Sequence, residues 1–346
     1  MKIDIELEEN LKEIEKKCLK RNGKNNLIEL SIDNIWKVNA MLKENSRYSI
    51  DKNEHMIPPD IEFVNCYLKK FIYNNNEVEE KYKKKACGST SWWAKQLKNL
   101  SDNDEESYKI IIAGLIHDID RMNSTHLNAD KNENKNKKNG RYLVFEMITE
   151  NYKNKTELIN ALMDEDKMPL IKLISQKNDN GKINFSFATK FCHYLSWNYL
   201  NDNNKDMYSI YDDVVSNSLP MYLETYKDNQ EILDYFEDTR KKLENFNENI
   251  TKKYFNNDKT VKEKFYRKFF SEPFFKKIDD KDAIVIFYQI YRKAIDKIRE
   301  ISSEDGKLIS RNAFDHLLWY GNKKNRKNEL KEKTLKEILE EESSSM

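Results

Sequence analysis

The sequence predicts an all-α protein, and three observations support that prediction. Glycine and proline are scarce, with 7 and 5 residues in a chain of 346, so few of the residues that make tight turns are present. Lysine, glutamate, leucine and isoleucine are abundant, a composition typical of helical proteins. Apolar residues recur at helical spacing along most of the chain, and no alternating run is long enough to require a β-sheet.

The N-terminal region is expected to form a series of helices. Charged amphipathic helices are predicted over 3–20 and 33–42, and another over 60–71 follows a pair of prolines. A helix through 92–97 follows three hydroxyl residues that can cap its first turn. The most apolar run of the chain, 107–120, is expected to be a core helix.

A polar segment separates this region from the rest of the chain. Residues 128–140, NADKNENKNKKNG, contain no apolar side chain beyond Ala129, which is typical of an exposed loop. We therefore divide the chain into an N-terminal helical region (1–128), a helical core (141–325) and a charged C-terminal tail (326–346). The lobes are expected to pack as one unit.

Beyond this segment the chain is again predicted to be helical. Lys190 is expected near the start of an apolar helix, and the polar run 201–206 is expected to be a loop because it offers nothing to bury. Asp212 and Asp213 then stand at the N-cap and in the first turn of the next helix, where negative charge is favoured. Gly321 is expected to end the helix before the tail. The other helices are predicted over 142–149, 157–163, 168–175, 231–246, 261–270, 282–301 and 311–320.

The balance of positive and negative residues leaves little net charge to attract a charged partner over a distance. The 61 lysines and arginines are offset by 60 aspartates and glutamates, so the net charge is +1. No overall field therefore draws the chain to nucleic acid. A DNA-binding face would require a local segregation of charge.

The spacing of the cysteines and the composition of the N-terminus indicate the cellular compartment in which the protein is expected. The 4 cysteines lie far apart and form no CxxC pair, which fits a reducing cytosol better than a disulfide framework or a zinc site. The N-terminus has no apolar signal region, and no apolar run approaches the length of a membrane span. We expect a cytoplasmic monomer that uses no metal or cofactor and does not contact a membrane.

One stretch, 184–226, carries the pattern on which a functional prediction depends. It contains the run FATKF at 187–191, with Lys190, then His193, and after the polar loop the run IYD at 210–212 before a helix. This stretch resembles the helix-hairpin-helix DNA glycosylase superfamily, in particular its divergent bacterial branch with an 8-oxoguanine-glycosylase-like fold. The resemblance implies a bilobal helical bundle with a cleft between the lobes.

The resemblance also implies a role for each residue of the pattern. Base excision breaks the N-glycosidic bond through a state with positive charge on the sugar, which a nearby carboxylate stabilises. Lys190 would be the nucleophile and Asp212 would lie across the pocket from it. An apolar surround and a helix start both lower the pKa of a lysine and so provide a neutral amine. The pocket for a flipped base would be formed by His193, Trp197, Asp213 and Trp319.

The chain departs from the superfamily pattern at one place, the turn before the lysine. The family turn before the lysine is rich in glycine, whereas residues 184–187 (NFSF) contain none, so a weaker backbone grip on a DNA phosphate is expected. Such relatives in bacteria often belong to defence or mobile elements. The resemblance therefore implies antiphage defence, with a hypermodified phage base or an oxidised guanine as the substrate.

Three alternatives stand beside this hypothesis. Lys190 can be a surface residue beside a core helix, and Asp212 can be only a helix cap. His117 and Asp118 are similar to the dyad of HD-type metal-dependent phosphohydrolases, which also need an upstream histidine and a downstream aspartate on other helices. His55 is the only upstream histidine, and it lies beside two prolines. A helical module that binds nucleic acid or protein without catalysis is the third alternative.

Overall fold

The protein is mostly helical, which confirms the predicted all-α class. The computed structural model describes residues 20–22, 27–31, 34, 90–123, 127, 140–176, 183–201, 205–255, 269–270, 273–278, 280–302 and 309–323. Within these residues the only sheet is an antiparallel pair of two-residue strands, β1 (Arg21–Asn22) and β2 (Leu27–Ile28). No helix in the described part of the chain is long and apolar enough to cross a bilayer.

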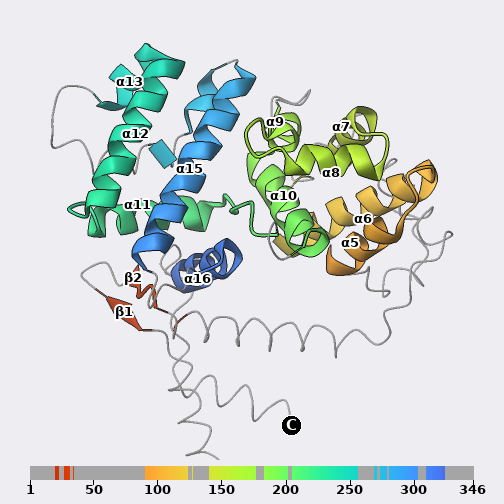
Figure 1. Cartoon of the computed structure of the whole chain (residues 1–346), viewed down its shortest axis with the longest axis horizontal. Coiled ribbons are helices and arrows are strands. Elements are labelled where there is room, and N and C mark those ends of the chain that lie inside the picture. Colours follow the sequence, from red (N-terminus) through yellow and green to blue (C-terminus); the bar gives the residue numbers. More distant parts are fainter. Residues whose placement is uncertain are drawn as a thin grey trace, which may run out of the picture.

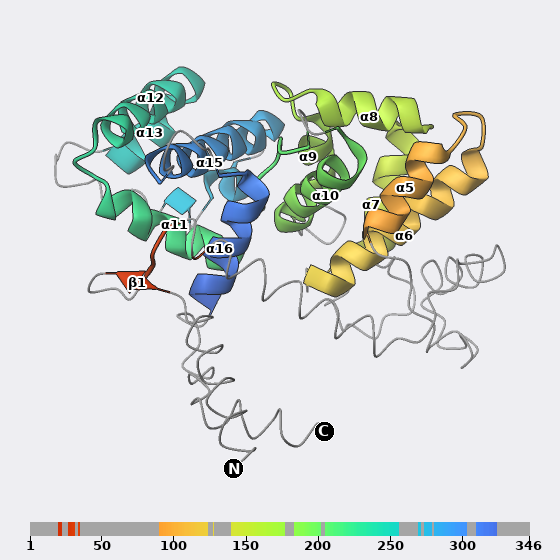
Figure 2. The same cartoon turned by 60° about the horizontal axis from the view of Figure 1, so that its bottom comes forward.

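The described helices form two groups (Figures 1 and 2). The first group contains α5 (Thr90–Asn99), α6 (Glu105–Asn123), α7 (Gly140–Asn151), α8 (Lys155–Met163), α9 (Pro169–Ile174) and α10 (Phe185–Tyr199). The second contains α11 (Asp213–Thr225), α12 (Gln230–Phe246), α13 (Glu248–Phe255), the 3-10 helix η2 (Phe274–Lys277), α15 (Lys281–Ile301) and α16 (Arg311–Lys323). Helices α6 and α7, on either side of 128–140, pack together within the first group. The larger division among the described helices therefore falls between α10 and α11, not at the polar segment.

Helices α5 and α6 pack closely because a glycine stands where they meet. A Cβ atom at Gly114 would lie 2.3 Å from the ring of Trp93, so a larger residue would force the helices apart. One turn further along α6, Asp118 accepts a hydrogen bond from the Trp93 indole N–H at 2.8 Å. The buried indole is therefore satisfied inside the core, as a buried tryptophan N–H requires.

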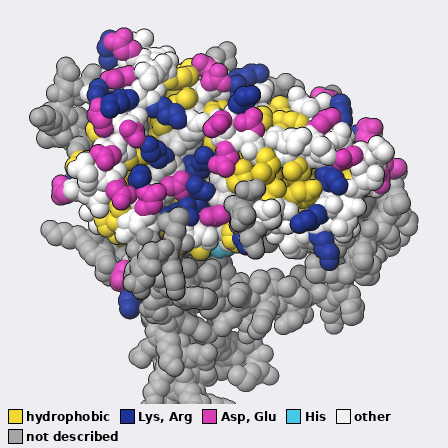
Figure 3. All heavy atoms as spheres, in the orientation of Figure 1, with side chains coloured by type: hydrophobic (Ala, Val, Ile, Leu, Met, Phe, Trp, Pro, Cys, Tyr) yellow, Lys and Arg dark blue, Asp and Glu magenta, His cyan; other side chains and the backbone are white. Residues whose placement is uncertain are grey.

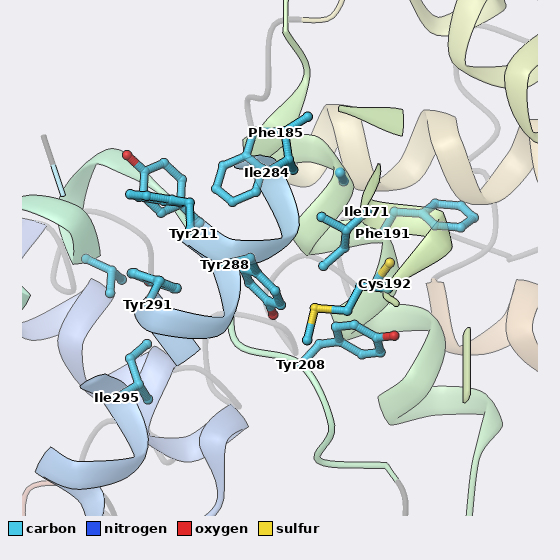
Figure 4. Close-up of a cluster of buried hydrophobic side chains, with 14 of the residues drawn as sticks. Ile171, Phe185, Phe191, Cys192, Tyr208, Tyr211, Ile284, Tyr288, Tyr291 and Ile295 are labelled. Carbon is cyan, nitrogen blue, oxygen red and sulfur yellow. The ribbon is translucent and has the colours of Figure 1, made fainter. Parts of the chain in front are cut away.

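Helix α15 joins the two groups. It packs against α9 in the first group and against α11, α12 and α16 in the second. An aromatic cluster fills the junction, and Figure 4 shows Phe185 of α10 beside Tyr211 and the α15 residue Tyr288. The centroid of the Phe185 ring lies 4.9 Å from that of Tyr211 and 6.0 Å from that of Tyr288. Burial of these large rings makes the junction part of a continuous core.

The predicted helices within the described residues are present, with two differences at their ends. Helix α10 begins at Phe185, so Lys190 lies in its second turn and not at its start. Gly321 does not end its helix, because α16 continues to Lys323. The predicted helices over 3–20 and 33–42, apart from Lys20 and Asn34, the helix over 60–71 and most of 261–270 lie outside the described residues.

Candidate functional site

Lys190 is a buried lysine on the face of α10 that packs into the core. Only 6% of its surface is exposed, and the neighbouring residues on the helix, including Phe187, Ala188 and Phe191, are buried. Burial lowers the pKa of the Lys190 amine, and the charge of Asp212 is the strongest influence in the opposite direction. Because Lys190 lies in the second turn, burial and not the helix start is the cause of the lowered pKa.

Asp212 caps the helix that follows, as the sequence predicts. Its Oδ1 atom accepts a hydrogen bond from the backbone N–H of Val215 at 2.8 Å, and 8% of its surface is exposed. Burial raises the pKa of this carboxyl group, whereas the charge of Lys190 and the backbone N–H groups of Val215 and Val214 lower it. Lys190 and Asp212 therefore form a buried pair in which each group stabilises the charged form of the other.

Asp213 stands beside this pair but differs from it in exposure. It is the first residue of α11 and is exposed to solvent. Its negative charge acts on Lys190 after that of Asp212. Its predicted contact with a base stays a prediction.

The segment that leads to Asp212 is buried and irregular, and side chains of α15 and α16 bind its backbone. The hydroxyl of Tyr288 accepts from the Ser209 N–H at 2.9 Å and donates to the Ser209 carbonyl at 2.8 Å. The hydroxyl of Tyr291 donates to the Ile210 carbonyl at 2.6 Å. Asp315 accepts from the Ile210 N–H at 2.8 Å. Buried backbone groups outside a helix or sheet need such partners, so these contacts hold the segment in one conformation.

Helix α10 binds the same segment from the other side. The Thr189 hydroxyl accepts a hydrogen bond from the Tyr211 N–H at 3.0 Å. The Nδ1 atom of His193 lies 2.6 Å from the Tyr208 carbonyl oxygen, and because a carbonyl only accepts, this nitrogen donates. The Nε2 atom of His193 lies 2.9 Å from the side-chain oxygen Oδ1 of Asn312 on α16.

These contacts give His193 a structural position. The ring is 1% exposed, and both of its nitrogens are occupied by protein groups. Burial lowers its pKa, while the contacts with the Tyr208 carbonyl and the Asn312 side-chain oxygen act in the opposite direction. We assign His193 to holding the segment before Asp212, and not to the base pocket expected from the sequence, because no ring nitrogen remains for a ligand.

The two tryptophans expected in the base pocket have different surroundings. Trp197 is half-buried, and its ring stacks on His193 with centroids 6.5 Å apart and an angle of 8° between the planes. The Lys205 ammonium lies 4.9 Å from the centre of the Trp197 ring. Trp319 is half-buried against the core. Neither position tests the prediction that these rings contact a flipped base.

A third carboxylate near the pair was not anticipated from the sequence. Asp120 of α6 is 5% exposed, and it is one of the acidic residues whose charge acts on Lys190. It forms an ion pair with Arg141 at 2.6 Å and accepts from the Leu127 N–H at 3.1 Å. Arg141 in turn lies 3.0 Å from Nδ1 of His117. The only signal in the sequence is an acidic residue at the end of the apolar run 107–120.

The His117–Asp118 pair is occupied by protein contacts. Asp118 is fully buried and accepts from Trp93, and His117 faces the guanidinium of Arg141. Within the described residues, no three histidine, cysteine, aspartate or glutamate side chains are grouped as metal ligands would be. His55 lies outside the described residues. The described part of the chain therefore offers no ligand set for the HD alternative.

The surface shows no extended region of one charge on the face that Figure 3 displays. Lysine and arginine side chains alternate there with aspartate and glutamate. This pattern agrees with the net charge of +1. Any nucleic-acid contact on this face would depend on individual basic residues and not on a broad positive field.

No protein-family model, no curated protein and no solved structure matches this chain. A fold class alone does not identify a function, because one fold supports many activities. The function is therefore argued from the Lys190–Asp212 pair and from the sequence resemblance over 184–226.

Proposed function

We propose that the protein is a DNA glycosylase of the helix-hairpin-helix type, with Lys190 as the nucleophile and Asp212 as its electrostatic partner. The observation that supports the proposal most strongly is the buried lysine with a lowered pKa beside a carboxylate fixed at a helix N-cap. Perturbed groups of this kind concentrate at functional sites. The resemblance over 184–226 gives the pair its chemical interpretation.

The chemistry follows from the charge states of the two groups. The bond between C1′ and the base breaks, and the departing base takes the electron pair and then a proton. The neutral Lys190 amine forms a bond to C1′ and loses a proton. Opening of the sugar ring then gives an imine between Lys190 and C1′. The Asp212 carboxylate stabilises the positive charge that develops on the sugar.

The surroundings of Lys190 favour the form that this chemistry needs, whereas those of Asp212 act in both directions. Burial lowers the pKa of Lys190 and so increases the fraction of neutral amine. Burial raises the pKa of Asp212, while the charge of Lys190 and two backbone N–H groups at the start of α11 favour its ionised form. Lys190 and Asp212 retain 6% and 8% of their surfaces exposed, so neither residue is completely enclosed.

We further propose that the two groups of helices are the lobes of this fold and that DNA binds between them. Helices α9 and α10 would be the helix-hairpin-helix unit, although residues 185–187, where the sequence suggested the family turn, are the first residues of α10. The target base would be flipped out of the duplex to reach Lys190. A hypermodified phage base or an oxidised guanine remains the proposed substrate, with a role in antiphage defence.

Borohydride trapping tests this proposal directly. The protein is incubated with DNA carrying oxidised guanine and with DNA of phages that carry hypermodified bases, and borohydride is added. We expect a covalent protein–DNA adduct with the wild type and none with Lys190→Gln, which keeps a polar side chain but lacks the amine. Lys227→Gln, a change at an exposed lysine, is the control and should still be trapped. Unchanged excision by Lys190→Gln would remove this residue from the mechanism.

A further inference from the structure

A small cavity lies between α12 and α15, and it shares no residue with the candidate site. Its volume is about 170 Å³. The polar lining consists of Asp238, Thr239, Lys241, Lys242, Gln289 and Lys293.

Lys242 is the unusual member of this lining. It is half-buried, and its ammonium donates a hydrogen bond to the side-chain oxygen of Gln289. Burial lowers its pKa, and the charges of Lys293 and Arg292 lower it further. Within the described residues, Lys242 forms no ion pair with a carboxylate, whereas Lys293 pairs with Asp238 at 2.5 Å and Arg292 pairs with Glu165 at 2.8 Å.

The position of the Lys242 ammonium is fixed before any ligand arrives. Gln289 accepts from Lys242 through its oxygen and donates through Nε2 to the Asp166 carbonyl at 2.9 Å. Both ends of this amide are therefore used, which sets its orientation. A cation that is partly removed from water and surrounded by cations is unfavourable unless an anion accompanies it.

We propose that this cavity binds a single dianionic phosphate group. Its three lysines and one aspartate give the lining a net charge of +2, from three positive charges and one negative charge, and the Lys241 ammonium also pairs with Glu237 at 4.0 Å. A phosphate monoester carries about −1.5 to −2 at pH 7, which matches this charge, whereas a backbone phosphodiester carries only one negative charge. The volume is below the roughly 300–1,000 Å³ of sites for drug-sized ligands, so one phosphate group fits and a whole nucleotide does not.

The phosphate would be either free inorganic phosphate or the terminal monoester of a nucleic acid. Both present the same group to the lysines, and the rest of a polynucleotide would remain outside the cavity. This proposal does not depend on glycosylase activity, because no residue of the Lys190–Asp212 pair takes part in it.

Thermal unfolding of the full chain tests the proposal with inorganic phosphate, at ionic strength matched by sodium chloride. We expect phosphate to raise the Tm of the wild type in a saturable manner, since a ligand that binds the folded state stabilises it. Lys242→Gln should lose this response. Without phosphate it should be as stable as the wild type or more stable, because it removes a cation that has no anion. Lys155→Gln is the matched control, since Lys155 is also half-buried and donates to an oxygen, the Leu100 carbonyl, outside the cavity.

Titration calorimetry should show that Lys242→Gln binds inorganic phosphate at least about tenfold more weakly than the wild type, a change of about 1.4 kcal/mol. Lys241→Gln should weaken binding in the same direction, and its side chain is 63% exposed, so folding should not be affected. Competition by a 5′-phosphorylated oligonucleotide, but not by its 5′-hydroxyl form, would identify a nucleic-acid end as the source. Competition by neither form would identify free phosphate. Equal phosphate responses in the wild type and both cavity variants would overturn the proposal.

Discussion

The Thr189 hydroxyl accepts a hydrogen bond from the Tyr211 N–H at 3.0 Å, and each of these residues immediately precedes one member of the Lys190–Asp212 pair. The contact therefore fixes the backbone of the segment before Asp212 against the helix that carries Lys190. Phe185 packs against the ring of Tyr211 at 4.9 Å and supports the same junction. The geometry of the pair thus depends on groups that have no chemical role themselves.

Replacement of Thr189 by valine should therefore affect both stability and excision. Valine has the same shape but leaves the buried Tyr211 N–H without a partner, which costs about 1–3 kcal/mol in the free energy of unfolding. Excision should also slow because Asp212 loses a fixed position. Urea unfolding measures the first effect. Thr189→Ser keeps the hydroxyl and is the control, so a loss of similar size in both variants would show that the hydrogen bond is not the cause.

Asp212 has two roles, as the N-cap of α11 and as a negative charge in the proposed site, and two substitutions distinguish them. Asparagine caps helices about as well as aspartate, so Asp212→Asn should change the free energy of unfolding little. Excision should nevertheless fall by about a hundredfold or more, because the charge that stabilises the sugar cation is lost. Asp212→Ala should lose about 1 kcal/mol of stability in addition. Equal excision rates for Asp212→Asn and the wild type would limit this residue to capping.

The elements that depend only on a short stretch of sequence could be predicted. The apolar period of α15 and the acidic start of α11 are properties of short stretches, so the helix and the cap at Asp212 followed from the sequence. The burial of Lys190 did not follow in the same way, because the sequence left open that it is a surface residue beside a core helix. The start of α10 could not be located, since Asn184 is not a side-chain cap in this structure.

The contacts between distant segments could not be predicted in the same way. Asp120 influences Lys190, and Asn312 binds His193, only because α6 and α16 pack against the surroundings of α10. Periodicity indicates which face of a helix is buried but not which helix covers it. His193 was therefore expected in a ligand pocket, while it holds the Tyr208 carbonyl in the core.

The two tyrosines of α15 that bind the segment before Asp212 should differ in their effects on stability. Tyr288→Phe removes a partner from both the N–H and the carbonyl of Ser209, whereas Tyr291→Phe removes one from the Ile210 carbonyl alone. Each buried group left unpaired costs about 1–3 kcal/mol, so Tyr288→Phe should have the larger effect on the urea midpoint.

Tyr108→Phe is the control for these two variants. The Tyr108 hydroxyl is buried and has no hydrogen-bond partner among the described residues, so its removal should be neutral or stabilising. A destabilisation by Tyr108→Phe as large as that by Tyr288→Phe would show that loss of the hydroxyl volume, and not of the hydrogen bonds, determines the result.

Metal analysis separates the glycosylase proposal from the HD alternative. The proposed chemistry uses no metal, so protein purified without a chelator should contain no stoichiometric manganese, iron, nickel or zinc, and EDTA should leave borohydride trapping unchanged. The HD alternative instead requires a transition metal held in part by His117 and Asp118. A full equivalent of metal that disappears in His117→Ala would move the active site to α6.

The pH dependence of excision should report the pKa of Lys190. Its usual value of 10.5 is lowered by burial, and the neutral amine is the reactive form, so the rate should rise with pH through one ionisation below 10.5. A rate that is independent of pH below 10.5, with chemistry shown to be rate-limiting, would contradict a role for this amine.

The pH dependence of the free energy of unfolding provides a second measurement of the Lys190 pKa. The sign of this dependence follows from the direction of the pKa shift. Between the lowered pKa of Lys190 and 10.5, the unfolded chain binds a proton that the folded protein does not, so stability rises with pH across this window. Relative to Lys190→Met, the free energy of unfolding of the wild type should therefore increase as the pH rises. Asp212 has the opposite behaviour in a separate window, because its raised pKa makes stability fall as the pH rises above 3.8. A difference between the wild type and Lys190→Met that stays constant up to pH 10.5 would show that the amine keeps an ordinary pKa, and the nucleophile would then have to be sought elsewhere.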